Sequence, residues 1–240
     1  MSKKKGTVLR QPFDQQKRLL QDKVLVHGSR VEEVLRDSIE MLRRQDRENA
    51  KRLLKEGHKL FRSQAAIKSN TLALLSTQQP MAGDLRFLAA VFQITLELGR
   101  VSYHTQEIVK ISLKLEERNH PEPFISIIHM ASSVTKMLHN AMAAFAERDP
   151  TLAQAISIQD NEIDDLYAYI NQRLLAVSRS DADAANHTIY LSQIAHQLER
   201  VGDRATNICE WVIYAVTGYM VEMNVELNLE NLDWIDSPAT

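Results

Sequence analysis

Apolar residues recur along most of the chain at intervals of three and four, the period of a helix with one buried face. Leu20, Val24, Val31 and Leu35 show this pattern early in the chain. The pattern predicts an all-α fold of six long amphipathic helices. They are expected at about 13–45, 46–77 and 84–118, followed by a fourth ending near 149, a fifth ending near 178–180 and a sixth ending near 218.

Helix-breaking residues are scarce, with 7 glycines and 6 prolines in 240 residues. Gln79-Pro80 predicts the end of the second helix, because proline pushes the preceding residue out of helical geometry. Asp84 is expected to cap the third helix. The segment from His120 to Pro123 contains two prolines and is predicted to link two halves of the chain.

The two halves show signs of an internal repeat. A shift of 103 positions places Asp46 on Asp149, and a shift of 100 places Arg100 on Arg200. Such a duplication predicts two pseudo-symmetric antiparallel three-helix bundles. The expected division is a flexible N-terminal tail at 1–12, a first bundle at 13–118, a linker at 119–123, a second bundle at 124–218 and an acidic C-terminal tail at 219–240.

Composition narrows the classes of function. The chain has 29 basic and 31 acidic residues, a balance that argues against a dedicated nucleic-acid binder. Cys209 is the single cysteine, which excludes an internal disulfide and a zinc-thiolate site. No uncharged apolar stretch approaches the ~20 residues needed to span a bilayer, so membrane contact is expected only through partners.

The sixth expected helix carries the first candidate metal ligands. Glu199, Asp203 and Asn207 follow one another at four-residue spacing, which places them along one stripe of a helix. Two carboxylates one turn apart repel each other unless a cation lies between them. Arg200 and Arg204 are expected on a different face, where they would neutralise the pair poorly, and a bound cation is the simplest remedy.

The fifth helix offers a matching pair, Asp160 and Asp164, and antiparallel packing would bring all four carboxylates together. Oxygen donors suit iron(III), manganese, magnesium or calcium, and His196 would extend the choice to zinc. Carboxylates at this spacing are also common on plain solvated helix faces, so spacing alone leaves both interpretations open. The predicted metal ligands are Asp160, Asp164, Glu199, Asp203 and Asn207.

Three segments of the sequence resemble the PhoU family. They are Phe13-Asp14 with the run from Leu19 to Glu33, the turn from Gln78 to Arg86, and the run from Leu198 to Asp203 that continues through Asn207-Ile208. Together they extend the resemblance over about 13–218.

The resemblance implies two similar three-helix bundles, each with a carboxylate-rich patch that holds an iron or zinc cluster, although another divalent cation is possible. It also implies a regulator without turnover that restrains the phosphate ABC transporter and the phosphate-sensing histidine kinase. Such a protein is expected to be cytoplasmic, peripheral to the inner membrane through its partners, and homodimeric.

The sequence departs from the family pattern in the first half. The positions equivalent to the four acids are Gly57, Phe61, Gly99 and Tyr103, none of which supplies a carboxylate. We therefore expect the first metal site to be lost or strongly altered. His58, His104 and Glu97 lie nearby in the sequence and are candidates for a substitute site. Asp84 and Arg86 occur only in the first half, where helix capping and surface pairing are the expected roles.

Two other classes of function remain open at this point. A metal-dependent enzyme is one, either a ferritin-like oxidase or a phosphohydrolase. The oxidase requires paired Glu-x-x-His motifs on facing helices, which this sequence lacks. The phosphohydrolase requires a metal site with open coordination positions, which a single carboxylate cluster can provide. A metal-free helical scaffold is the other class.

Overall fold

The computed structural model describes residues 3–115 and 121–223, and within these ranges the chain forms helices and no strand. The all-α prediction is therefore confirmed. The helices are α1 (Lys3–Arg44), α2 (Arg47–Gln78), α3 (Gly83–Ser112), α4 (Pro121–Glu147), α5 (Pro150–Ser180) and α6 (Ala185–Thr217), with a short 3-10 turn at Ala182–Ala184.

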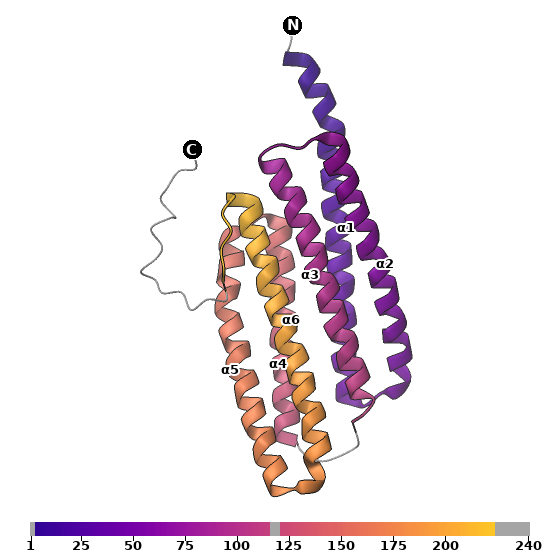
Figure 1. Ribbon diagram of the computed structural model, residues 1–240, viewed down its shortest axis with the longest axis vertical. Helices are drawn as coiled ribbons and strands as arrows, with labels where there is room; N and C mark the ends of the chain where they lie inside the picture. Colours follow the sequence, from indigo (N-terminus) through magenta and orange to yellow (C-terminus); the bar gives the residue numbers. More distant parts are fainter. Residues whose placement is uncertain (1–2, 116–120, 224–240) are drawn as a thin grey trace, which may run out of the picture.

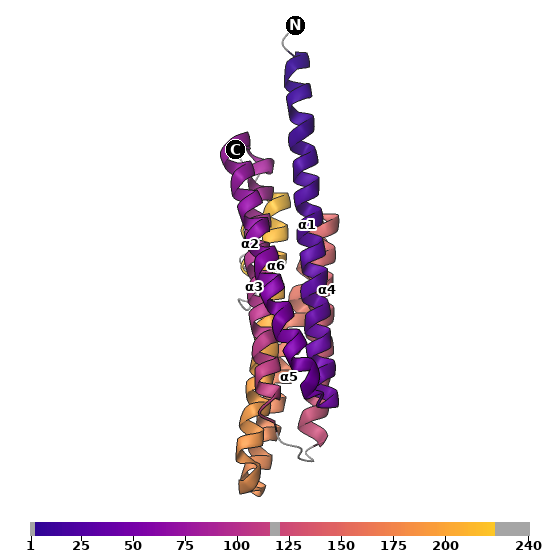
Figure 2. The same cartoon turned by 90° about the vertical axis from the view of Figure 1, so that its right-hand side faces the viewer.

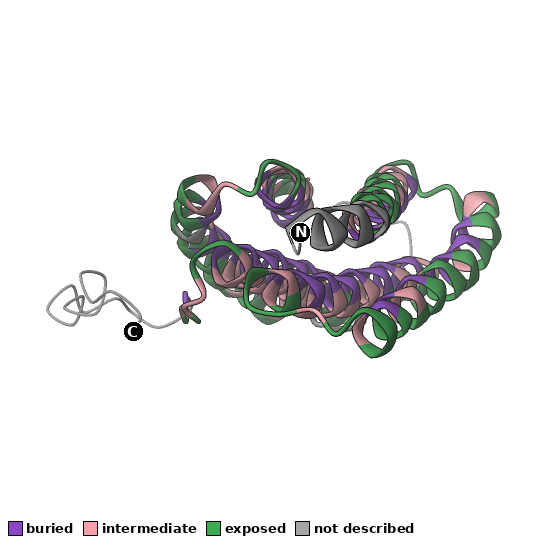
Figure 3. Ribbon diagram, turned by 90° about the horizontal axis from the view of Figure 1, so that it is seen from above, coloured by how far each residue is buried: buried purple, intermediate pink, exposed green. Residues whose placement is uncertain are grey.

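The six helices form two layers. One layer is a row in the order α5, α6, α3, α2, and α4 and α1 lie behind it (Figure 1; Figure 2). Seen along the helices, the row is curved, with the buried residues on its inner side and in its middle (Figure 3). Each half of the chain is an antiparallel three-helix bundle, and the halves join chiefly along α3 and α6. One continuous apolar core runs through both halves.

The internal repeat is visible in both burial and backbone geometry. Gln45 and Arg148, related by 103 positions, both adopt a left-handed conformation with φ of 54° at the end of their helices. Leu98 and Leu198, related by 100 positions, are both fully buried, and they lie on α3 and α6, the helices along which the halves join. Other related pairs are buried alike: Val31 and Val134 and Leu35 and Leu138, which are 103 positions apart, and Ile94 and Ile194, Val101 and Val201, and Ile108 and Ile208, which are 100 positions apart.

Two helix ends differ from the prediction in the first half. The backbone is helical from Lys3, ten residues before the expected start at Phe13, because extending an existing helix needs no new nucleus. The third helix ends at Ser112 rather than near 118, since the following turn tightens and the Lys114 N–H donates to the Ile111 carbonyl at 2.9 Å.

The fourth helix begins inside the linker that was predicted at 119–123. Pro121 and Pro123 belong to the first turn of α4, where a missing N–H leaves no helical hydrogen bond unmade. The rest of the linker, 119–120, lies outside the described residues, as does the acidic tail beyond residue 223. None of the described helices is long and apolar enough to cross a bilayer.

The expected cap of α3 was wrong. Ala82 occupies the N-cap position and makes no side-chain hydrogen bond to the helix. Asp84 lies inside the first turn and forms an ion pair with Lys17 of α1. The carboxylate therefore ties α3 to α1, because Lys17 offers it a charged partner that the helix end does not.

Candidate metal centre

Four acidic side chains lie along the antiparallel pair of α5 and α6. Asp160 and Asp164 come from α5, and Glu199 and Asp203 come from α6. Asp160 approaches α6 at Gly202, where its Oδ1 atom lies 3.4 Å from the point that a Cβ on the glycine would occupy. Asp160 is 9% exposed, whereas Asp164 is open to solvent, so the group extends from the interior to the surface.

These acids are close enough to raise one another's pKa. The pKa of Asp160 is raised to about 6, chiefly by burial and also by the charges of Asp164, Asp203 and Glu199, while a hydrogen bond with Thr206 lowers it. Burial also raises the pKa of Asp164 and the pKa of Glu199, and the charge of Asp203 adds to both shifts. Carboxylates held in this way favour any cation that enters among them.

The expectation that the neighbouring arginines would not neutralise the acids was wrong. Arg200 Nη1 lies 3.1 Å from Asp203 Oδ2, and Arg204 Nη2 lies 3.6 Å from the same oxygen. Arg200 Nε also lies 3.7 Å from Glu199 Oε2. Adjacent helix positions do point about 100° apart, but Arg200 and Asp203 are three residues apart and face each other. The arginines therefore already balance part of the charge of α6.

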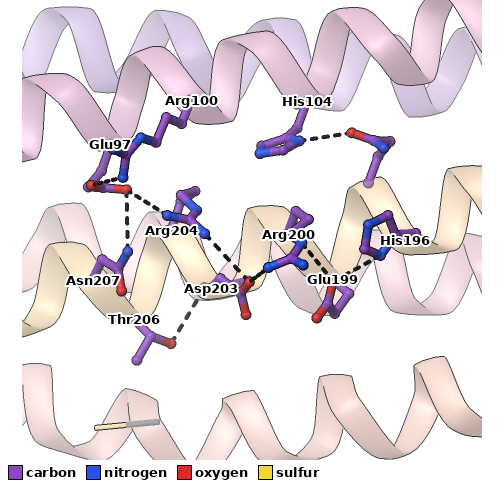
Figure 4. Close-up of polar contacts among 12 residues, drawn as sticks. Glu97, Arg100, His104, His196, Glu199, Arg200, Asp203, Arg204, Thr206 and Asn207 are labelled. Carbon is purple, nitrogen blue, oxygen red and sulfur yellow. Dashed lines mark hydrogen bonds and ion pairs between the residues drawn. The ribbon is translucent and has the colours of Figure 1, made fainter. Parts of the chain in front are cut away.

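Asn207 does not join the acids. Its amide lies against Glu97 of α3, with Nδ2 3.4 Å from Oε2 (Figure 4). With the amide turned over, its partners would be Arg204 and the backbone carbonyl of Asp203, and none of the four carboxylates. Each four-residue step rotates a helix position by about 40°, so the eight residues from Glu199 to Asn207 turn the side chain towards the other neighbour.

Glu199 provides an observation that favours a ligand. Its Oε2 atom is buried and has no hydrogen-bond partner, although His196 Nδ1 lies 3.3 Å away in poor geometry and is itself unpartnered. Among the described residues, no three His, Cys, Asp or Glu side chains converge on one point as they stand. The oxygen donors fit a hard cation, but holding it requires side-chain rotation and displacement of Arg200.

The corresponding region of the first half is built differently. A Cβ on Gly57 would meet the amide of Gln106, and a Cβ on Gly99 would meet the amide of Gln64. The glutamines thus fill the seam between α2 and α3. Phe61 and Tyr103, which replace two of the acids, are 69% and 59% exposed.

The suggested substitute site in the first half does not form. His58 is exposed on α2, and His104 Nδ1 lies 2.8 Å from Gln197 Oε1 of α6. Glu97 is buried and points towards Arg204. The three side chains therefore point to different neighbours, because successive helix positions rotate by about 100°.

Sequence reasoning missed the network that Glu97 makes between the halves. Glu97 is 4% exposed, and its carboxylate meets Arg100 at 2.7 Å, Arg204 at 3.5 Å and Asn207 at 3.4 Å (Figure 4). The network couples α3 of the first half to α6 of the second. Its only sequence signal was an acid within the apolar face of α3, between Ile94 and Leu98.

The fold and the acids define a class of protein, a tandem pair of three-helix bundles that carries one carboxylate patch. The family model described as the PhoU domain matches residues 27–112 and again residues 127–212. The chain belongs to the PhoU family.

Relatives and solved structures agree with this assignment. The chain is 30% identical over 216 residues to the phosphate-specific transport system accessory protein PhoU homolog of Clostridium acetobutylicum, covering 90% of this chain and 99% of the relative. It is 27% identical to the accessory protein PhoU of Escherichia coli, covering 86% of each. The crystal structure of the regulatory protein PhoU from Streptococcus pneumoniae superposes with a TM-score of 0.82, at 26% identity, over 88% of this chain and 99% of that one.

A second crystal structure, PhoU from Pseudomonas aeruginosa, has a TM-score of 0.83 at 26% identity, over 86% of this chain and all of that one. The prediction of two tandem bundles is therefore confirmed in both sequence and shape.

Proposed function

We propose that this chain regulates phosphate uptake by binding the phosphate ABC transporter and the phosphate-sensing histidine kinase, without catalytic turnover. The observation that carries the proposal is the match over both domains and almost the whole length of relatives named as phosphate-transport accessory or regulatory proteins. A protein of this kind works at the cytoplasmic face of the inner membrane through its partners.

The second half would hold the metal. Asp160, Asp164, Glu199 and Asp203 are the proposed ligands, and the buried Oε2 of Glu199, which makes no hydrogen bond, supports the assignment. Iron or zinc is the expected metal, and another divalent cation is compatible with the oxygen donors. A cation here would join α5 to α6 and draw the acids away from Arg200 and Arg204. Asn207 is left out, because its amide lies beside Glu97.

Inactivating the gene in the source organism tests the regulatory role. Uptake of labelled phosphate by cells grown in excess phosphate should rise when the chain is lost and return to its original rate when the chain is restored. Cross-linking the restored, tagged chain in these cells should capture subunits of the phosphate transporter or the kinase. Unchanged uptake together with absent transporter and kinase peptides would contradict the proposal.

Elemental analysis of natively purified protein tests the metal site. Glu199→Gln combined with Asp203→Asn should abolish bound iron or zinc. Glu162→Gln combined with Asp165→Asn is the matched control, because both side chains are exposed on α5 beside the site. Equal metal content in the two double variants would remove the assignment while leaving the regulatory role open.

The homodimer stays a prediction. Light scattering coupled to size-exclusion chromatography would give its mass directly. A mass near 27.4 kDa, that of a single chain, would contradict it.

A further inference from the structure

A cavity of about 440 Å³ lies at one end of the molecule, where helices of both halves meet. It is enclosed by α1, the start of α3, the end of α4 and the end of α6. Its lining includes the cations Lys17, Arg86 and Arg148 and the apolar side chains Phe87, Phe145 and Val212. Asp84 is the one carboxylate in the lining, so the cavity carries a surplus of two positive charges.

Arg86 is the cation whose partner is missing. Its Nε–H group is buried and donates to no acceptor among the described residues. The guanidinium lies against the turn that ends α6, with Cζ 3.4 Å from the point that a Cβ on Gly218 would occupy. Gly218 has φ of 87° and leaves room for the arginine. A buried donor without an acceptor is costly, and an anion in the cavity would relieve it.

Arg148 adds a second cation without a carboxylate among the described ion pairs. It follows α4 in a left-handed conformation, and its Cζ atom lies 4.5 Å from the centre of the Phe87 ring. Its Nη2 atom donates a hydrogen bond to Gln21 Oε1 at 3.2 Å. Lys17, by contrast, is already paired with Asp84 and Asp14. Two arginines therefore remain available for a ligand.

The other half of the repeat lacks the charged residues that line this cavity. The positions related to Asp84, Arg86 and Arg148 at the opposite end are Ala184, Asn186 and Gln45. Packing of two equivalent bundles therefore does not require cations at this place. The first turn of α3 also lines the cavity, and its N-cap residue, Ala82, makes no side-chain hydrogen bond to the N–H groups of that turn. The positive end of the helix dipole there favours an anion.

We propose that this cavity binds a small phosphate monoester. The phosphoryl group would pair with Arg86 and Arg148, since guanidinium groups match phosphate oxygens with two parallel hydrogen bonds. The organic part would pack on Phe87 and Phe145, because the volume exceeds what inorganic phosphate needs and falls within the ~300–1,000 Å³ of small-molecule sites. The inference is independent of the metal and of the partners proposed above.

Titration calorimetry of the full-length chain tests the inference with three probes: adenosine monophosphate, inorganic phosphate and adenosine. Adenosine monophosphate should bind one per chain, inorganic phosphate should bind more weakly, and adenosine should not bind. Binding of the monophosphate should weaken as salt is raised. Equal affinity for monophosphate and phosphate would overturn the role of the apolar wall and support an oxyanion site alone.

Variants separate a ligand site from a structural cluster. Arg86→Gln and Arg148→Gln should each weaken the binding of adenosine monophosphate at least about tenfold, the loss of one charge-assisted contact. Arg43→Gln should leave the affinity unchanged, because Arg43 pairs with Glu40 on the surface away from the cavity. Melting curves of all three variants show whether each is folded. No binding of the monophosphate or phosphate to the folded wild type, or binding that both cavity variants retain, overturns the proposal.

Discussion

Asp160 lies so close to Gly202 that a Cβ added to the glycine would stand 3.4 Å from the Asp160 Oδ1 atom. This distance is an ordinary contact, so the packing around Gly202 leaves room for alanine. Alanine is favoured over glycine inside a helix by about 1 kcal/mol. We therefore expect Gly202→Ala to raise the free energy of unfolding by about 0.5–1 kcal/mol, measured by urea denaturation.

Gly99→Ala is the matched comparison in the first half. A Cβ there would lie 2.0 Å from the Gln64 amide, which would have to move and give up its hydrogen bond to the Thr95 carbonyl. This loss should offset the gain in helix propensity. Destabilisation of Gly202→Ala by more than 1 kcal/mol would mean that Asp160 sits more tightly than the contact indicates.

The raised pKa of Asp160, about 6, predicts an unusual dependence of stability on pH in metal-free protein. Between pH 4 and 6 the folded chain holds a proton on Asp160 that the unfolded chain has released. The contribution of this group to stability is therefore greatest at low pH and is lost as pH rises through about 6. Asp160→Asn should match wild type near pH 4 and exceed it by about 2 kcal/mol at pH 7.

Denaturation of both proteins at several pH values after chelation checks this expectation. Paired acids such as Glu56, whose pKa is lowered to about 2, make stability rise with pH, but they do so equally in both proteins. The difference in free energy of unfolding between wild type and Asp160→Asn therefore reports on Asp160 alone. Asp165→Asn, on the exposed face of α5, should follow wild type throughout. A constant difference across pH 4–7 would show that Asp160 titrates normally.

The fold was predictable because helical periodicity and breakers are local signals. Pro150 and Gly218 stand at the observed helix boundaries, and Asp149 caps α5 through the N–H groups of Thr151 and Leu152. Ends set by tertiary contacts were less predictable. Asp84 looked like a cap but pairs with Lys17, which is 67 residues away in the sequence.

The candidate site was predictable only in part. Spacing along α5 and α6 brought the four acids to one helix pair, because helix register is regular over two turns. Spacing alone did not predict that the long arginine side chains reach Asp203. It also wrongly included Asn207, which lies beside Glu97. The contact between Glu97 and Arg204 depends on how α3 crosses α6, which is a property of packing between the halves.

The repeat predicts equal costs for equivalent core truncations. Leu98 of α3 and Leu198 of α6 are both fully buried. Leu98→Ala and Leu198→Ala should each lower the free energy of unfolding by about 2–5 kcal/mol, and the two values should agree within about 1 kcal/mol. Leu72→Ala, at an exposed position of α2, is the control and should change little. Strongly unequal losses would show that the halves are not equivalent at their interface.

A metal bound by the acids should stabilise the fold. Adding iron or zinc to chelated protein at 100 times its dissociation constant should raise the free energy of unfolding by about 2.7 kcal/mol. Glu199→Gln should remove most of this gain, whereas Glu162→Gln, exposed on α5, should keep it. Thermal melting with and without metal measures the effect. An equal gain in both variants would place the stabilising ion elsewhere.

The buried carboxylate of Glu97 should contribute more to the free energy of unfolding than the carboxylates of exposed ion pairs. Glu97→Gln removes the charge that faces Arg204, whose side chain is 18% exposed and whose Nε already lacks a partner. We expect a loss of about 1–3 kcal/mol in the free energy of unfolding, because the largely buried guanidinium of Arg204 keeps only Asp203 as a counter-charge. Glu107→Gln, which breaks an exposed pair with Lys110, should change stability by less than about 0.5 kcal/mol.

A double-mutant cycle completes the argument for Glu97. Replacing Arg204 by methionine removes the stranded charge, so Glu97→Gln combined with Arg204→Met should be less destabilised than the two single losses added together. Additive losses would mean that the two side chains contribute separately, and α3 and α6 would then be held together by their apolar contacts alone.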